Sequence, residues 1–265
     1  MINKLIRNSL LLMAAVALNA SLAHATLIPT GLSVTAGTEF WSFSFEGTGS
    51  FSLISGGATS SSTYDGTPTV TGADPLNGSL TDTGDGTGFD GSARVTGVGD
   101  EFAIGFDSTL TTTNTHVTES YDIVFKLVFS NSVNADGDDA YALSVLTLDA
   151  DLAEIFYSDL LSDTLFGDED GGIATGGYGD LLTGGGSPTY AYTLNPGEAL
   201  TLDLFWTMVG GNFVDIGLAE ASLSAFLSID SVVTRGGPPP TVPVPGTLLL
   251  MGLGMILLRL TGCLK

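Results

Sequence analysis

Hydrophobic and polar residues alternate one by one along several stretches of the chain. In residues 121–129 the odd positions carry Tyr, Ile, Phe, Leu and Phe, and in residues 200–208 the even positions carry Leu, Leu, Leu, Trp and Met. A period of two residues is typical of a β-strand with one face in the core, because successive side chains point to opposite faces. The same alternation predicts strands over 41–45, 102–106 and 223–229.

The remaining patterns also favour strands. Residues 140–148 are apolar on both faces, as in a central strand, and the best helix candidate is the short segment 152–161. Residues 55–92 are rich in Ser, Thr, Gly and Asp, which predicts either a long surface loop or weak edge strands. Many strands, Gly-rich turns and few helices are typical of all-β proteins. We therefore expect residues 26–235 to form a single antiparallel, jelly-roll-like β-sandwich.

Residues 1–25 have the organisation of a secretory signal peptide. Lys4 and Arg7 form a positive region, residues 10–18 are apolar, and the segment ends in Ala-His-Ala, a small-x-small cleavage site. We predict that signal peptidase removes this segment as a cleavable signal helix and that the mature chain begins at Thr26.

The C-terminal end predicts a membrane segment behind a linker. Residues 236–245 hold five of the ten prolines and should form an extended spacer. Residues 246–258 are uncharged and end at Arg259; as a helix they rise about 20 Å. Extension through the tail gives a short membrane helix with a basic end over 246–265, the basic end staying cytoplasmic. The alternative is a helix buried in the protein core.

This C-terminal layout resembles the sorting signal of PEP-CTERM proteins. The proline-flanked motif is Val242, Pro243, Val244 and Pro245, with Val244 where the family typically has Glu, and Arg259 follows the apolar run. In that family a membrane protease, exosortase, is thought to cleave at the motif. Its members are usually surface or extracellular-matrix proteins of Gram-negative bacteria that produce exopolysaccharide. The resemblance implies transit through the inner membrane, exosortase as a partner, and a final place at the cell envelope or outside the cell.

The charge of the chain is strongly negative, with 29 acidic residues against 7 basic ones and a net charge of −22. Residues 26–235 contain all the acids and only Arg94, Lys126 and Arg235 as bases, a net charge of −26. Nucleic acid is excluded as a partner, because phosphate binding needs clustered Lys and Arg. Cys263 is the only cysteine, so the acidic domain has no internal disulfide.

Acidic clusters next to glycine are the best candidates for metal binding. Asp136, Asp138 and Asp139 surround a glycine, and carboxylates around a tight turn suit a hard cation such as calcium. Further clusters lie in residues 82–90 and 167–172. The alternative is that all of these segments are solvated acidic turns.

Candidates for catalysis are few. His116 is the only histidine after the signal peptide and lies in a polar Thr-rich segment, so we expect an exposed structural role. Glycoside hydrolysis needs two carboxylates close together, but such pairs arise by chance among 29 acids. Tyr178, Tyr190 and Tyr192 lie near Gly-rich segments and are candidates for a carbohydrate platform, the alternative being core or edge packing.

The sequence thus predicts four parts: a signal peptide over 1–25, an acidic β-sandwich over 26–235, a Pro-rich linker with the sorting motif over 236–245, and a membrane helix over 246–265. We expect an exported, non-enzymatic surface or extracellular-matrix protein that binds calcium or exopolysaccharide. The alternatives are a secreted glycosidase or lyase that acts on matrix polysaccharide, and a self-assembling structural protein.

Overall fold

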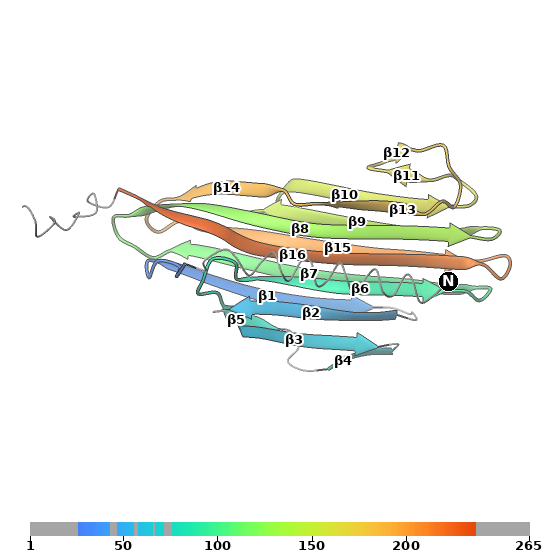
Figure 1. The fold of residues 1–265 in the computed structure, drawn as a ribbon, viewed down its shortest axis with the longest axis horizontal. Helices are drawn as coiled ribbons and strands as arrows, with labels where there is room; N and C mark the ends of the chain where they lie inside the picture. Colours follow the sequence, from blue (N-terminus) through green and yellow to red (C-terminus); the bar gives the residue numbers. More distant parts are fainter. Residues whose placement is uncertain (1–25, 43–46, 56–57, 66, 72–75, 237–265) are drawn as a thin grey trace, which may run out of the picture. The chain divides into compact units, whose positions relative to one another are not determined.

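All elements of the computed structural model are β-strands (Figure 1), and the residues that it describes are 26–42, 47–55, 58–65, 67–71 and 76–236. Within these ranges no helix is long and apolar enough to cross a membrane. The signal peptide, the sorting motif with Arg259 and the C-terminal membrane helix lie outside the described residues, so they stay predictions of the sequence.

The strands form two antiparallel sheets. Sheet I has the spatial order β12-β11-β10-β9-β15-β7-β1-β5. Sheet II has the order β13-β8-β16-β6-β2-β3-β4, with β14 also paired to β8. The bounds are Leu32–Ser42 (β1), Gly47–Ser55 (β2), Ala58–Asp65 (β3), Thr67–Thr71 (β4), Asn77–Ser79 (β5), Gly86–Val95 (β6), Asp100–Asn114 (β7), Ser120–Asp136 (β8), Ala140–Ala150 (β9), Ala153–Asp163 (β10), Glu169–Asp170 (β11), Ile173–Ala174 (β12), Leu182–Gly186 (β13), Thr189–Leu194 (β14), Ala199–Asn212 (β15) and Leu218–Arg235 (β16).

The two sheets pack as a sandwich because their inward faces bury apolar side chains in one shared core. The chain passes repeatedly from one sheet to the other, between β6 and β7, between β8 and β9, and between β15 and β16. The predicted β-sandwich is therefore confirmed. In the observed strand order β1 lies in sheet I and β16 lies in sheet II, and the jelly-roll-like arrangement stays a prediction of the sequence.

The core lies between the sheets and contains the residues that the alternation selects. The odd residues of β8 from 121 to 127 and the even residues of β15 from 200 to 208 are buried, as predicted. Phe106 and Trp206 are neighbours on β7 and β15, with ring centroids 4.7 Å apart. Phe89 of sheet II stacks on both rings at 5.1 Å. This aromatic stack therefore joins the two sheets at the centre of the core.

The predicted helix at 152–161 is wrong, because these residues form a hairpin turn and strand β10. Asp151 and Leu152 both have positive φ, of 47° and 71°, as a two-residue type I′ turn between antiparallel strands requires. A bulge between Glu154 and Phe156 then interrupts the alternation. Extra residues at a bulge shift the inward-facing positions by one, and this produced the helix-like spacing of apolar residues.

The Gly-rich segment 55–92 contains strands rather than one long loop, so the edge-strand alternative is correct for most of it. Gly86 and Gly88 belong to β6, which is an inner strand of sheet II. A Cβ atom at either position would lie 2.2 Å from a backbone oxygen of β16. These glycines therefore permit a close approach between strands instead of marking turns.

Candidate functional site

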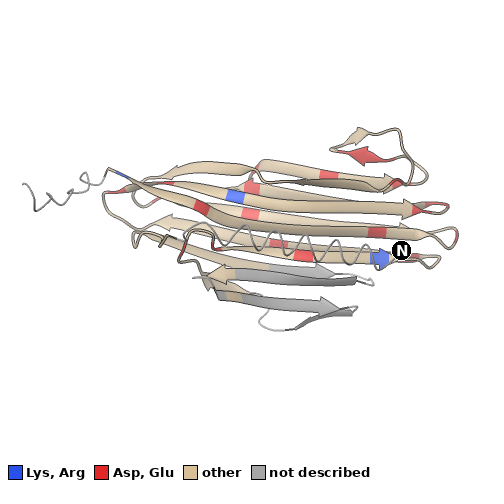
Figure 2. Cartoon of the chain, in the orientation of Figure 1, with Lys and Arg blue, Asp and Glu red and all other residues tan. Residues whose placement is uncertain are grey.

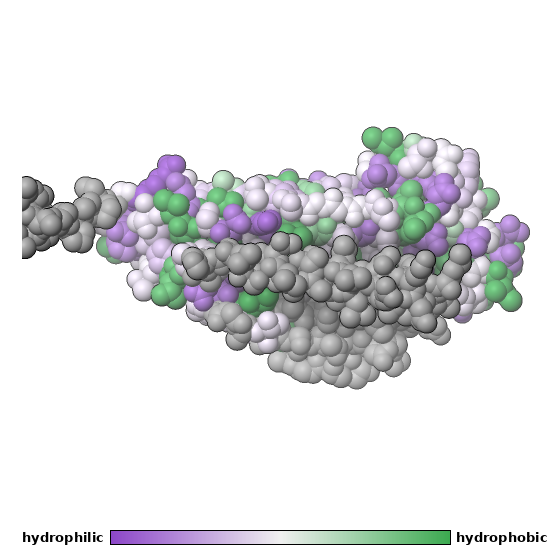
Figure 3. Space-filling view, viewed as in Figure 1, coloured by the Kyte–Doolittle hydropathy of each residue, from purple (hydrophilic) through white to green (hydrophobic). Residues whose placement is uncertain are grey.

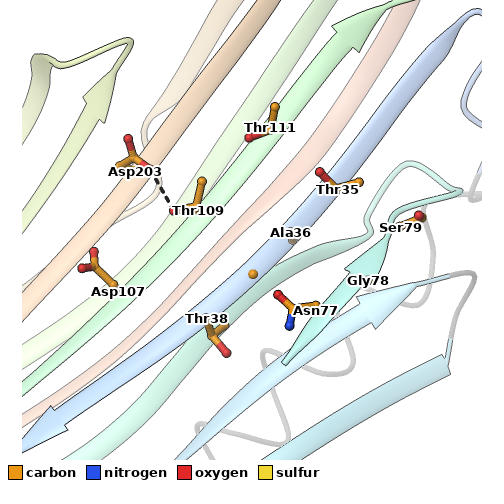
Figure 4. A pocket seen from close by; sticks show the side chains of 11 residues that line it. Thr35, Ala36, Thr38, Asn77, Gly78, Ser79, Asp107, Thr109, Thr111 and Asp203 are labelled. Carbon is orange, nitrogen blue, oxygen red and sulfur yellow. Dashed lines mark hydrogen bonds between the residues drawn. The ribbon is translucent and has the colours of Figure 1, made fainter. Parts of the chain in front are cut away.

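A shallow groove of about 770 Å³ crosses the outward face of sheet I. Strands β1, β5, β7 and β15 line it (Figure 4). Its outward-facing polar side chains are hydroxyls, carboxylates and one amide, from Thr35, Asn77, Ser79, Asp107, Thr109, Thr111 and Asp203. The Thr38 side chain, in contrast, is buried, and its hydroxyl oxygen accepts the Leu76 N–H.

The groove exists because glycine interrupts a row of outward-facing residues. Strand pairing places Asn77, Gly37, Thr109 and Asp203 side by side on β5, β1, β7 and β15. Without a side chain, Gly37 leaves a hollow between Asn77 and Thr109, and a Cβ atom there would lie 3.0 Å from Asn77 Oδ1. Gly78 on the edge strand β5 widens the hollow.

Hydrogen bonds hold the groove-lining side chains in place. The Thr109 hydroxyl donates to Asp203 Oδ1 at 2.8 Å (Figure 4), and the hydroxyls of Thr111 and Thr201 are 3.5 Å apart. These residues lie on central strands of a sheet, which is a rigid base for a binding site. The groove therefore presents a fixed set of donors and acceptors to a polar ligand.

Sheet I carries no positive charge on its strands. Arg94, Lys126 and Arg235, the basic residues of the described chain, lie on β6, β8 and β16 of sheet II (Figure 2). Of the residue types Lys, Arg, Asp and Glu, the strands of sheet I contain only Asp and Glu. An anionic ligand at the groove would therefore meet repulsion without a compensating charge.

Of the residues predicted to bind calcium, Asp136 lies at the end of β8, and Asp138 and Asp139 lie on the turn that follows. Asp136 and Asp138 are exposed, Asp139 is half-buried with a φ of 60°, and the backbone N–H of Asp138 donates to Asp215 Oδ1 at 2.9 Å. In the described part of the chain, no three His, Cys, Asp or Glu side chains are arranged to hold a metal ion. The structure thus places Asp215 at this turn but does not gather a ligand set, and calcium binding stays a prediction.

Two other acidic clusters serve the fold. Asp85 is buried, and its Oδ2 accepts backbone N–H groups of Thr81 and Asp82 at 2.7 and 2.8 Å. Asp168 is 1% exposed and accepts three backbone N–H groups, from Asp163, Gly179 and Asp180, at 2.8 to 2.9 Å. Neither segment is simply a solvated turn, because its buried carboxylate organises the loop around it.

His116 belongs to the turn between β7 and β8. Its Nδ1 accepts the backbone N–H groups of Thr118 and Glu119, at 3.3 and 2.9 Å, and its Nε2 lies 3.7 Å from Glu119 Oε2. These contacts hold the ring in the turn, where it is half-buried rather than exposed as expected.

The three predicted platform tyrosines do not lie together on one surface. Tyr178 is exposed on the loop before β13, whereas Tyr190 and Tyr192 of β14 pack against the core. Burial, with a smaller effect from Tyr192, raises the pKa of Tyr190 to about 12. Tyr192 also lines a second hollow of about 420 Å³ with Asp151 and Glu198. Core and edge packing is therefore the correct alternative for Tyr190 and Tyr192.

Exposed large hydrophobic side chains lie on the loop before β11, on β12, on the loop between β12 and β13, and on the loop between β15 and β16. They include Phe166 (82% exposed), Ile173 (72%), Tyr178 (65%) and Ile216 (83%). In Figure 3 hydrophobic residues stand among hydrophilic ones at the loops, without a broad continuous field. Scattered apolar residues are ordinary on a protein surface, so the groove is the stronger candidate site.

Sequence reasoning missed the groove. The outward positions of the Thr-rich segment around 109–113 were visible as a polar strand face, but their partners Thr35 and Asn77 come from strands far away in the chain. Only strand pairing brings these side chains to one place.

Comparison with known proteins identifies no family. The sequence matches no family model and no curated protein. A chain in the structure of the infectious bursal disease virus Gx strain has 9% identity and a TM-score of 0.17, over 86% of this chain and 72% of that one. The VP2 subviral particle of the same virus has 10% identity and a TM-score of 0.14, over the same shares. TM-scores this low carry no argument about function.

Proposed function

We propose that this protein is an exported, exosortase-sorted surface or extracellular-matrix protein that binds polysaccharide without acting on it as an enzyme. The groove on sheet I is the observation that carries the binding role. Support for export comes from the sequence, through the signal peptide pattern of residues 1–25 and the PEP-CTERM-like C-terminal segment.

The chemistry of the groove suits a sugar chain. A saccharide presents many hydroxyl groups, each able to donate and accept, and the groove offers threonine hydroxyls, the Asn77 amide and the carboxylates of Asp107 and Asp203. The groove is shallow, and β5 lies at one edge of sheet I, so a long polymer is able to enter from the side. Many weak polar contacts along an open surface are suited to holding a polymer rather than enclosing a small molecule.

One observation favours a glycosidase or lyase as a second candidate. Asp107 pairs with Phe205 and Asp203 pairs with Thr109, so the two acids are diagonal neighbours, and the Cα atoms of such positions are about 7–8 Å apart. Inverting glycosidases place their carboxyl groups about 6.5–9.5 Å apart. A general acid also needs a raised pKa. Burial raises the pKa of Asp90, but Asp90 lies on β6 of sheet II and does not line the groove. New reducing ends that disappear with Asp107→Asn would identify the enzyme.

Replacing Gly37 by leucine should block polysaccharide binding and leave the fold intact. The new side chain would fill the hollow, while its Cβ would lie 3.0 Å from the end of the Asn77 side chain and at an ordinary contact distance of 3.9 Å from the Leu76 carbonyl oxygen. We expect at least about a tenfold loss of affinity, which corresponds to about 1.4 kcal/mol. Affinity electrophoresis of the full chain in gels containing exopolysaccharide measures the effect.

The matched control for this variant is Thr113→Leu. Thr113 faces outward on β7 beyond the groove lining, so the same side chain is added to the same sheet face. Both variants should stay within about 0.5 kcal/mol of the unchanged protein in the free energy of unfolding. Retained binding by the Gly37 variant, or equal loss in the control, would contradict the role of the groove.

Export predicts two new ends for the mature chain. Intact-mass measurement on material from envelope and culture medium should show a chain that starts at Thr26 and ends near Pro245, because signal peptidase and exosortase act at these places. Protein that retains residue 1 and is recovered from the cytoplasm would contradict the proposal.

A further inference from the structure

The lining of the groove restricts the charge of its ligand. Asp107 and Asp203 are its ionisable residues, and every Lys or Arg of the described chain lies on sheet II. Uronate, sulfate or phosphate groups on a polymer would face these carboxylates across the groove without a cation to offset them.

The negative charge continues beyond the groove along one row of sheet I. Asp203 is paired with Asp149 on β9, and Asp149 is paired with Glu154 on β10. Directly opposite residues of neighbouring strands have Cβ atoms about 4.5–5.5 Å apart, where like charges destabilise a sheet. A cationic group bound beside Asp203 relieves this repulsion, so the free energy gained on binding is greater for a cation than for a neutral group.

We infer that the groove selects a polysaccharide with free amine groups, such as a glucosamine polymer, over neutral and anionic polysaccharides. This inference rests on the proposed function, because it assumes that the groove binds a sugar chain. The ammonium groups would lie beside Asp107 and Asp203, and the sugar hydroxyls would bond to the threonine hydroxyls of Thr35, Thr109 and Thr111.

The neutral part of the lining favours a sugar over a basic peptide or a polyamine. Strand pairing sets the lining residues Ser79, Thr35 and Thr111 side by side across β5, β1 and β7, and continues the row outside the lining with Thr201 on β15. This row of four hydroxyl residues runs beside the row that contains Asp203, two residues away along each strand. A saccharide uses both rows, whereas a linear polyamine uses only the carboxylates.

The test compares a glucosamine oligomer with its fully N-acetylated counterpart, which has the same backbone and no charge. Binding to the full chain in non-ionic detergent is measured by calorimetry at low and at high salt. We expect about a tenfold preference for the amine form at low salt, because two carboxylates each contribute about two- to fivefold. The preference should fall as salt screens the charges.

The decisive variant is Asp107→Asn together with Asp203→Asn. Asparagine keeps an oxygen that accepts the Thr109 hydroxyl, so binding of the acetylated oligomer should persist while the preference for the amine form falls to near one. The control is Glu220→Gln with Asp230→Asn, which removes the same charge from exposed positions on β16 of sheet II and should keep the preference.

The outcomes separate this inference from the proposed function. Equal affinity of the unchanged protein for both oligomers, or equal loss of preference in the sheet II control, overturns the selection for amines and leaves polysaccharide binding in place. Binding of neither oligomer overturns the proposed function as well. If spermine binds as tightly as the glucosamine oligomer, the groove is a general cation site and the assignment to a sugar is wrong.

Discussion

Replacing Trp206 by alanine is expected to lower the free energy of unfolding by about 3–5 kcal/mol, the usual range for a buried tryptophan. Its ring is fully buried, stacks on Phe106 and Phe89 from the two sheets, and donates its Nε1–H to the Ser144 hydroxyl at 3.3 Å. The substitution removes these contacts, leaves a cavity and deprives a buried hydroxyl of its donor. The sandwich should lose much of its stability, because typical domains have only about 5–15 kcal/mol in total.

Phe205→Ala is the matched control for Trp206→Ala. Phe205 is the next residue on β15, so its side chain lies on the opposite, half-exposed face of sheet I. We expect it to lower the free energy of unfolding by about 1 kcal/mol. Urea unfolding followed by circular dichroism measures both, and equal losses would show that the two sheets do not meet at Trp206.

Replacing Asp168 by asparagine is expected to lower the free energy of unfolding by about 2–4 kcal/mol. The carboxylate is buried and both of its oxygens accept backbone N–H groups, Oδ1 from Asp163 and Gly179 and Oδ2 from Asp180. Asparagine puts an NH₂ group in place of one of the two oxygens, so this NH₂ group would face a backbone N–H group and both would be hydrogen-bond donors. The loop from 163 to 180 should then lose protection in hydrogen exchange before the core strands do.

Asp170→Asn separates hydrogen bonding from charge in this test. Asp170 is exposed on β11 two residues away, and its replacement removes the same charge. It should leave the free energy of unfolding within about 0.5 kcal/mol of that of the unchanged protein.

The loss of stability caused by Asp168→Asn should be the same with calcium and with a chelator, because backbone N–H groups occupy both carboxylate oxygens of Asp168. A loss of stability that appears only with calcium would instead make Asp168 a metal ligand.

The inward and outward faces of the main strands were predictable from the sequence because period-two alternation is a local property. Tyr121, Phe125 and Leu127 of β8 are buried as the alternation requires. The exception was β10, where the bulge after Glu154 breaks the period and the turn at Leu152 uses a conformation that leucine rarely adopts. At this segment, pairing with β9 outweighed the local pattern.

The acidic clusters show a different limit. The sequence shows where carboxylates gather but not which of them are buried. Asp85 and Asp168 became acceptors for backbone N–H groups, while Asp136 and Asp138 stayed exposed. This distinction depends on how each loop folds back on itself, and both loops fold around contacts that are set by neighbouring strands.

By itself, the sequence determined the strand-rich class, the composition of the core faces, the negative charge and the two terminal segments that predict export. These are properties of neighbouring residues or of the whole composition. Only the tertiary structure decided the strand order, the placement of Arg94, Lys126 and Arg235 on sheet II, and the groove. Gly37, Asn77, Thr109 and Asp203 line that groove from four strands, and they meet only because hydrogen bonding between distant segments sets their register.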